Sequence, residues 1–277
     1  MRWQSGPRSG NIQDRRGRGG LIAGGGIGAV VLTIVALLLG VDPRAITTGG
    51  GPAAEIETSD PNRYAGTDEE ADFVSAVLAD TETAWHDLFR ARGMTYQEPQ
   101  LVLFENVVQS ACGMAQSAVG PFYCPLDQHV YLDMSFFREL DQNFGAPGDF
   151  ARAYVIAHEV GHHVQTLLGT AERVGAAQQR TTPAGANQLQ VRMELQADCY
   201  AGVWAYHART QRDKLDPDDL GEALAAAAAI GDDRLQKQAQ GHVVPESFTH
   251  GTSAQRMQWF REGFDNGDPA RCDTFAS

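Results

Sequence analysis

Apolar residues recur along the chain at two spacings, one typical of helices and one typical of short strands. A helix is predicted over residues 67–93, where Thr67 and Glu70 form a capping box ahead of apolar positions three and four residues apart. Two short apolar runs, Leu101–Phe104 and Val130–Asp133, predict strands.

Helical spacing dominates the second half of the chain. We expect a buried helix over about 150–168, a second around Met193–Gly202 with Asn187 as its candidate cap, and a third over 216–230. Residues 170–188 are rich in Gln, Ala, Gly and Thr and are predicted to form a mobile flap. The pattern therefore indicates an α+β fold that is mostly helical with a small sheet.

The amino-terminal region, residues 1–66, differs in composition from the rest of the chain. Residues 21–40 form an uncharged, apolar run of twenty residues, long enough to cross a ~30 Å hydrocarbon core as one transmembrane helix. Residues 1–20 are basic, which predicts a cytoplasmic tail, a single-pass anchor in the cell membrane and an extracytoplasmic domain. Residues 41–66 are rich in Gly, Pro, Thr and Ser and predict a flexible linker to a domain over 67–277. A cleaved signal peptide is the competing interpretation, although its apolar core would be only about 7–15 residues long.

Charge narrows the choice of partners. The 277-residue chain carries a net charge of −13, and residues 1–20, with five arginines and one aspartate, contribute +4, so the remainder carries −17. An acidic body argues against nucleic acid as a partner. Gly24 and Gly28 form one Gly-x-x-x-Gly pair, which predicts a weak homodimer through the membrane helix.

The predicted helix over 150–168 contains a His-Glu-x-x-His motif. His158 and His162 are four residues apart and share a helix face, so both imidazoles can bind one zinc ion. Glu159 lies about 100° round the helix from His158, where its carboxylate can take a proton from a water molecule at the metal. A chance match on an ordinary amphipathic helix is the alternative.

A third zinc ligand is expected downstream. Glu194 and Asp198 have the Glu-x-x-x-Asp spacing of gluzincins such as thermolysin, and on a helix they share a face. Glu194 is predicted to bind the zinc ion, and Asp198 to accept a hydrogen bond from His158. Three protein ligands leave one position open, which is typical of a catalytic site. A solvated charge is the competing interpretation of Glu194.

Two further candidates lie near the carboxyl end. His250 is predicted to donate to the oxyanion of a tetrahedral intermediate, and Arg256 to orient that intermediate or to bind a carboxylate. The alternative is structural, with His250 in a loop and Arg256 paired to an acidic neighbour. Residues 130–133 are the candidate edge strand for a peptide substrate. Residues 231–234 could approach the site, but the preferred interpretation is that their charges are solvated.

The chain has four cysteines, an even number that suits disulfides in an oxidising compartment. Three pairings are possible. We favour Cys112–Cys124, which closes a short loop, and Cys199–Cys272, which would pin the tail to the helix that carries Glu194.

Six segments carry a resemblance to a known family: Ser110–Ala115, Gly120–Pro125, Gly148–Ala151, His158–Gln165, Glu194–Gly202 and Phe248–Gly251. Together they resemble the bacterial putative neutral zinc metallopeptidase family of the YpfJ type. The resemblance covers about residues 65–277 together with the amino-terminal anchor. It implies a membrane-attached, zinc-dependent peptidase.

The expected protein is a zinc metalloendopeptidase with a zincin-type domain that acts on a peptide or protein substrate. One zinc ion is bound by His158, His162 and Glu194, and Glu159 is the general base. Two alternatives stay open, a catalytically silent zinc-binding scaffold of the cell envelope and an amidase that acts on cell-wall peptides.

Overall fold

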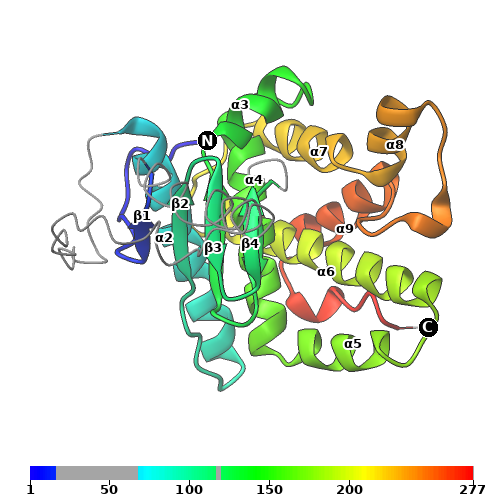
Figure 1. Cartoon of the computed structure of the whole chain (residues 1–277). Coiled ribbons are helices and arrows are strands. Elements are labelled where there is room, and N and C mark those ends of the chain that lie inside the picture. The colour runs from blue at the N-terminus through cyan, green and yellow to red at the C-terminus, as the bar shows by residue number, and fades with distance from the viewer. Residues whose placement is uncertain (17–67, 117–119, 277) are drawn as a thin grey trace, which may run out of the picture.

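The computed structural model describes residues 1–16, 68–116 and 120–276, and it combines a small sheet with a larger set of helices (Figure 1). The main sheet has the strand order β1-β2-β6-β5: Ile12–Asp14, Gln100–Phe104, His129–Asp133 and Phe122–Cys124. Strands β1 and β6 run parallel to β2, and β5 runs antiparallel to β6. A separate hairpin joins β3 (Val107–Ser110) to β4 (Gly113–Gln116).

Helices make up most of the described chain, so the expected α+β class with a small sheet is confirmed. They are α2 (Glu69–Ala91), α3 (Ser135–Gln142), α4 (Asp149–Leu167), α5 (Thr170–Gln178), α6 (Pro183–Thr210), α7 (Asp219–Ala229), α8 (Asp232–Gln240) and α9 (Ser253–Asn266), with short 3-10 turns η3 (Pro245–Ser247) and η4 (Pro269–Arg271).

Helix α4 carries the His-Glu-x-x-His motif and is buried along most of its length. Its first turn is held by α7, because the carboxylate of Glu222 accepts from the backbone N–H of Phe150 at 2.9 Å. Gly148 precedes the helix with φ of 117°, and a Cβ there would collide with Glu222. The helix ends before Gly169, which is left-handed. The predicted boundaries of this helix are therefore confirmed to within about one residue.

Helices α4, α6 and α9 pack closely because glycines lie where they cross. A Cβ at Gly161 of α4 would stand 2.9 Å from the carbonyl oxygen of Ala197 of α6. A Cβ at Gly202 of α6 would collide with the backbone of Phe260, and one at Gly263 of α9 with the backbone of α6. These contacts set how far the helices stand apart.

The segment 170–188 and the cap at Asn187 differ from expectation. Helix α5 and the start of α6 occupy this segment, which is therefore helical, and residues of α5 line the cavity described below. Its mobility stays a prediction. Helix α6 is capped by Thr182, whose hydroxyl accepts from the backbone N–H of Gly185. The prediction that Asn187 caps the helix is wrong, because Pro183 at the first helical position already starts it.

Residues 1–16 belong to the same folded unit as the helices, which the sequence pattern did not predict. Strand β1 pairs with β2, and Ile12 is fully buried beside Leu101. The indole of Trp3 donates to Asp149 at the start of α4, at 3.1 Å. Trp3 and Ile12 are isolated apolar residues among several arginines, so the sequence pattern gave no sign that this segment is folded.

The predicted membrane helix over 21–40, its Gly24 and Gly28 pair and the linker over 41–66 all lie outside the described residues. Within the described ranges, none of the helices combines the length and apolar character that a membrane crossing requires.

Candidate metal centre

Helix α4 presents the His-Glu-x-x-His side chains, among others, to a cavity of about 690 Å³. His158 and Glu159 are buried, and His162, one turn further along, is slightly more exposed. The helical offset of four residues brings the two imidazole rings together, with centroids 4.8 Å apart.

Helix α6 crosses α4 and delivers Glu194 to the same point. One carboxylate oxygen of Glu194 lies 3.1 Å from Nε2 of His158 and 3.5 Å from Nε2 of His162. The three side chains offer ligand atoms that all lie within 4.8 Å of one another. Tetrahedral zinc with bonds of ~2.0–2.1 Å would hold its ligand atoms ~3.4 Å apart, so this donor set fits zinc.

His158 is oriented by a buried group of charged and polar side chains. Its Nδ1 lies 2.9 Å from Asp198, whose carboxylate also accepts from the hydroxyl of Tyr154 and from the guanidinium of Arg256 at 2.8 and 2.9 Å. A carboxylate can only accept here, so Nδ1 of His158 carries the proton and Nε2 faces Glu194.

Burial and charge set the ionisation of the two glutamates. Burial alone would raise the pKa of Glu194, but the imidazoles of His162 and His158 outweigh it and hold that pKa well below its usual value. Burial raises the pKa of Glu159, and the same two imidazoles offset only part of the rise. Glu194 is therefore a fixed anion, whereas Glu159 is shifted toward the range in which a carboxylate can exchange protons.

His250 lies at the cavity on the segment between η3 and α9, with its side chain half exposed. Asp232, the first residue of α8, accepts from the backbone N–H groups of Thr249, His250 and Gly251 at 2.8, 2.6 and 2.9 Å. Its other oxygen lies 3.2 Å from Nδ1 of His250. The interpretation of residues 231–234 as solvated charges is wrong for Asp232, which is buried and holds this loop.

Arg256 lines the inner part of the cavity but is almost completely buried, so its direct contact with a substrate stays a prediction. The side chain is 1% exposed. Its guanidinium donates to Asp198, to the hydroxyl of Tyr154 and to the carbonyl of Ile230. The alternative drawn from the sequence, a pairing with an acidic neighbour, is what the structure contains.

The predicted edge strand is also wrong, because β6 lies between β2 and β5. Strand β5 ends the main sheet in the described part of the chain, and its residues Phe122 and Tyr123 line the cavity. The hydroxyl of Tyr123 lies 3.1 Å from Nδ1 of His163 on α4, which ties this strand to the metal-site helix. The edge strand is therefore β5, the neighbour of the strand that was predicted.

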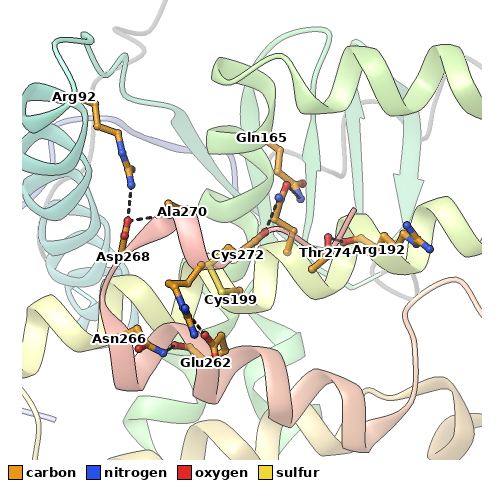
Figure 2. Close-up of a disulfide and its surroundings, with 12 residues drawn as sticks. Arg92, Gln165, Arg192, Cys199, Glu262, Asn266, Asp268, Ala270, Cys272 and Thr274 are labelled. Atoms are coloured by element: carbon orange, nitrogen blue, oxygen red, sulfur yellow. Dashed lines mark hydrogen bonds and ion pairs between the residues drawn. A yellow bond between two sulfur atoms is a disulfide. The ribbon is translucent and has the colours of Figure 1, made fainter. Parts of the chain in front are cut away.

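Both favoured disulfides are present in the structure. Cys112–Cys124 joins the tip of the β3–β4 hairpin to β5, and Cys199–Cys272 joins α6 to the carboxyl-terminal segment (Figure 2).

Sequence reasoning missed Tyr154 as a member of the site, and it considered an approach of residues 231–234 but preferred solvated charges there. Tyr154 stands one turn before His158 on the same helix face, so helical periodicity could have found it. Asp232 offers no comparable signal, because its partners are backbone groups of residues 249–251 and only the fold brings them together.

Comparisons with known proteins identify the family of the chain. The family model described as "Putative neutral zinc metallopeptidase" matches residues 1–275. The chain is 51% identical over 288 aligned residues to the uncharacterized protein YpfJ of Escherichia coli (strain K12), covering 99% of both chains. It is 43% identical over 264 residues to the uncharacterized protein Rv2575 of Mycobacterium tuberculosis (strain ATCC 25618 / H37Rv), covering 87% of this chain and 85% of that one. No solved structure matches the chain.

Proposed function

This chain belongs to the putative neutral zinc metallopeptidase family, and we propose that it is a zinc-dependent peptidase that hydrolyses peptide bonds. The observation that carries the proposal is the convergence of His158, His162 and Glu194 beside Glu159 at the same cavity. A purely structural zinc site would use a fourth protein ligand and would not need a carboxylate next to it.

His158, His162 and Glu194 would bind the zinc ion, and Glu159 would transfer protons. Zinc in such a site polarises a carbonyl group and lowers the pKa of a water molecule to ~7. Glu159, the general base, accepts the proton of the attacking water and returns it to the departing amine. Its raised pKa suits both transfers, because a carboxylate that titrates nearer neutral pH can take and give a proton.

His250 is the candidate donor to the oxyanion. Asp232 receives Nδ1–H of the ring, which leaves Nε2 free for the cavity. When the imidazole is protonated, Nε2 also donates, and it can then stabilise negative charge that develops on the substrate oxygen. Arg256 has a different role, since it holds Asp198 and through it His158.

The walls of the cavity favour an extended peptide with a large apolar side chain. The outer edge of β5 offers backbone groups to which a peptide can add as a further strand. Apolar residues from α3, α4 and α8 and from the segments after α3 and α7 line the cavity: Phe136, Phe144, Val155, Ile230 and Leu235. Burying a large apolar side chain against them would contribute about 1.5–3 kcal/mol.

Membrane attachment through residues 21–40 stays a proposal, but its topology changes. Two disulfides support an oxidising, extracytoplasmic compartment for the domain. Residues 1–16 pair with that domain in one sheet, so a single crossing with a cytoplasmic amino-terminus would separate partners that touch. We therefore propose that residues 1–16 and 68–276 lie on the same side.

The proposal is tested by digestion of a peptide library with the purified full-length protein in detergent. We expect cleavage next to large apolar residues, its loss with 1,10-phenanthroline and its return when zinc is added back. Mass spectrometry of the products identifies the sites. Absence of any chelator-sensitive cleavage, with zinc shown to be bound, would refute the peptidase assignment.

A further inference from the structure

Gln165 contacts the second histidine of the motif from within the core. It lies three residues after His162 on α4 and is fully buried. Its Oε1 is 2.8 Å from Nδ1 of His162, and its Nε2 donates to the carbonyl of Met193 at 2.7 Å and to Oε1 of Gln196 at 3.1 Å. Both Met193 and Gln196 lie on α6, beside Glu194.

The direction of these hydrogen bonds is set by two backbone carbonyls. The carbonyl of Met193 can only accept, so the amide nitrogen of Gln165 must face it and Oε1 must face His162. His162 therefore donates from Nδ1, and the lone pair of Nε2 remains free for a metal ion. In the same way, Gln196 donates to the carbonyl of Cys272 at 2.8 Å, so its Oε1 faces Gln165.

The carbonyl of Cys272 is itself held in place. The Cys199–Cys272 disulfide fixes it to α6, and the hydroxyl of Thr274 donates to the carbonyl of Arg192 at 2.7 Å (Figure 2). Figure 2 shows Gln165 near this carboxyl-terminal segment, which lies beside α6. A chain of four groups thus joins the end of the protein to the metal site: the carbonyl of Cys272, Gln196, Gln165 and His162.

We propose that Gln165 is a positioning residue for His162, and that the disulfide-bonded carboxyl-terminal segment sets its orientation through Gln196. We call the Cys272 carbonyl, Gln196 and Gln165 the amide relay. The proposal rests on the zinc site of the proposed function. Its consequence is that zinc affinity depends on residues as far along the chain as Cys272, which are not ligands of the ion.

The test measures the dissociation constant of zinc by competition with a chromophoric chelator, on the full-length protein in detergent. Gln165→Met keeps the size of the side chain and removes its three hydrogen bonds, and we expect zinc to bind about 10–100-fold more weakly. Gln258→Met on the exposed face of α9 is the matched control and should bind zinc as the wild type does. Circular dichroism of the metal-free proteins establishes that each is folded.

A double-mutant cycle separates a relay from a general loosening of the core. Gln196→Met should weaken zinc binding less than Gln165→Met, because it acts through Gln165. In the Gln165→Met background, Gln196→Met should add less than about a twofold change, because the relay is already broken. Should Gln165→Met fail to fold, Gln196→Met alone must still weaken zinc binding, and an unchanged affinity would overturn the proposal.

The two disulfides provide a second comparison within one chain. Replacing Cys199 and Cys272 by serine should weaken zinc binding by about tenfold. Replacing Cys112 and Cys124 by serine removes a disulfide that does not touch the relay, and zinc affinity should stay within about twofold of wild type.

The outcomes distinguish this proposal from the proposed function. A wild-type protein that binds no zinc would refute the proposed function. Zinc binding in the wild type with equal affinity in Gln165→Met, or with effects of Gln165→Met and Gln196→Met that multiply, would refute the relay and leave the peptidase assignment standing.

Discussion

The site depends on carboxylates that each serve several partners. Asp198 accepts from His158, Tyr154 and Arg256 inside the core, and burial that would raise its pKa is outweighed by Arg256 and His158, which lower it. Removing one partner of such a group typically costs about 3–5 kcal/mol, because a buried charge is left uncompensated. Arg256 therefore matters for the metal site through its contact with Asp198.

Asp232 permits a test of the same principle by pH. Burial would raise its pKa, but hydrogen bonds from the side chain and backbone of His250 lower it below the usual value. Because the pKa of Asp232 is lower in the folded state, its carboxylate stabilises the fold at pH values above the unfolded-state pKa of ~3.9. This stabilisation is lost as the pH falls through the folded-state pKa. We expect Asp232→Asn to lower the free energy of unfolding by about 2 kcal/mol at pH 7.

This difference between wild type and Asp232→Asn should shrink below about pH 4, as the wild-type carboxylate is protonated. Urea unfolding of the metal-free proteins from pH 3 to 7 measures it. Asp265→Asn, on an exposed position of α9, is the control and should differ little from wild type. A difference that stays constant across this pH range would contradict the role assigned to the Asp232 carboxylate.

At the scale of elements, the distance between α4 and α6 decides whether Glu194 reaches the two histidines. Gly161 lies between His158 and His162 and faces the backbone of Ala197, three residues after Glu194. A side chain at position 161 would force the two helices apart, because the carbonyl of Ala197 is backbone and cannot rotate away.

We expect Gly161→Ala to destabilise the protein by about 1–3 kcal/mol through overpacking and to weaken zinc binding measurably. Gly221→Ala in α7 is the matched control, because a Cβ there meets nothing within 4 Å, and it should leave the protein as stable or slightly more stable. Thermal unfolding and zinc competition compare the two. Equal zinc affinity in both variants would show that the helix spacing is not critical.

The metal-site helix could be predicted from the sequence because its apolar spacing, its motif and Gly169 all lie within one short stretch. The same holds for Glu194, since its spacing to Asp198 is local. Strand β1 could not, because three residues show no periodicity and its pairing with Leu101 spans most of the amino-terminal half. The choice of β5 as the edge likewise depends on strand order, which is a property of the whole sheet.

For the whole molecule, the position of residues 1–16 is the main correction. Arg2 pairs with Asp213, and Arg8 pairs with Asp72, so basic residues that suggested a cytoplasmic tail instead bind the acidic domain. Part of the net charge of +4 on the first twenty residues is thus neutralised by ion pairs within the fold. The charge pattern of the sequence alone could not distinguish arginines that flank a membrane segment from arginines that pair with acidic residues of the domain.

Cysteine labelling tests the inferred topology. All four native cysteines are disulfide-bonded, so single cysteines at the exposed positions Gln4 and Gln240 report on residues 1–16 and on the domain. We expect a membrane-impermeant maleimide to label both variants equally in spheroplasts, with detergent-treated samples as the control for reactivity. Labelling of only one of the two would contradict a common side and restore a single crossing.

The most direct test of the central claim is the Glu159→Gln variant, compared with wild type for zinc content and peptide hydrolysis. We expect one zinc ion per chain in both proteins and a fall in hydrolysis of about 10²–10⁴-fold in the variant, because only the general base is lost. Glu172→Gln, at an exposed position of α5, should retain wild-type activity. Full hydrolysis by Glu159→Gln with zinc bound would contradict the account.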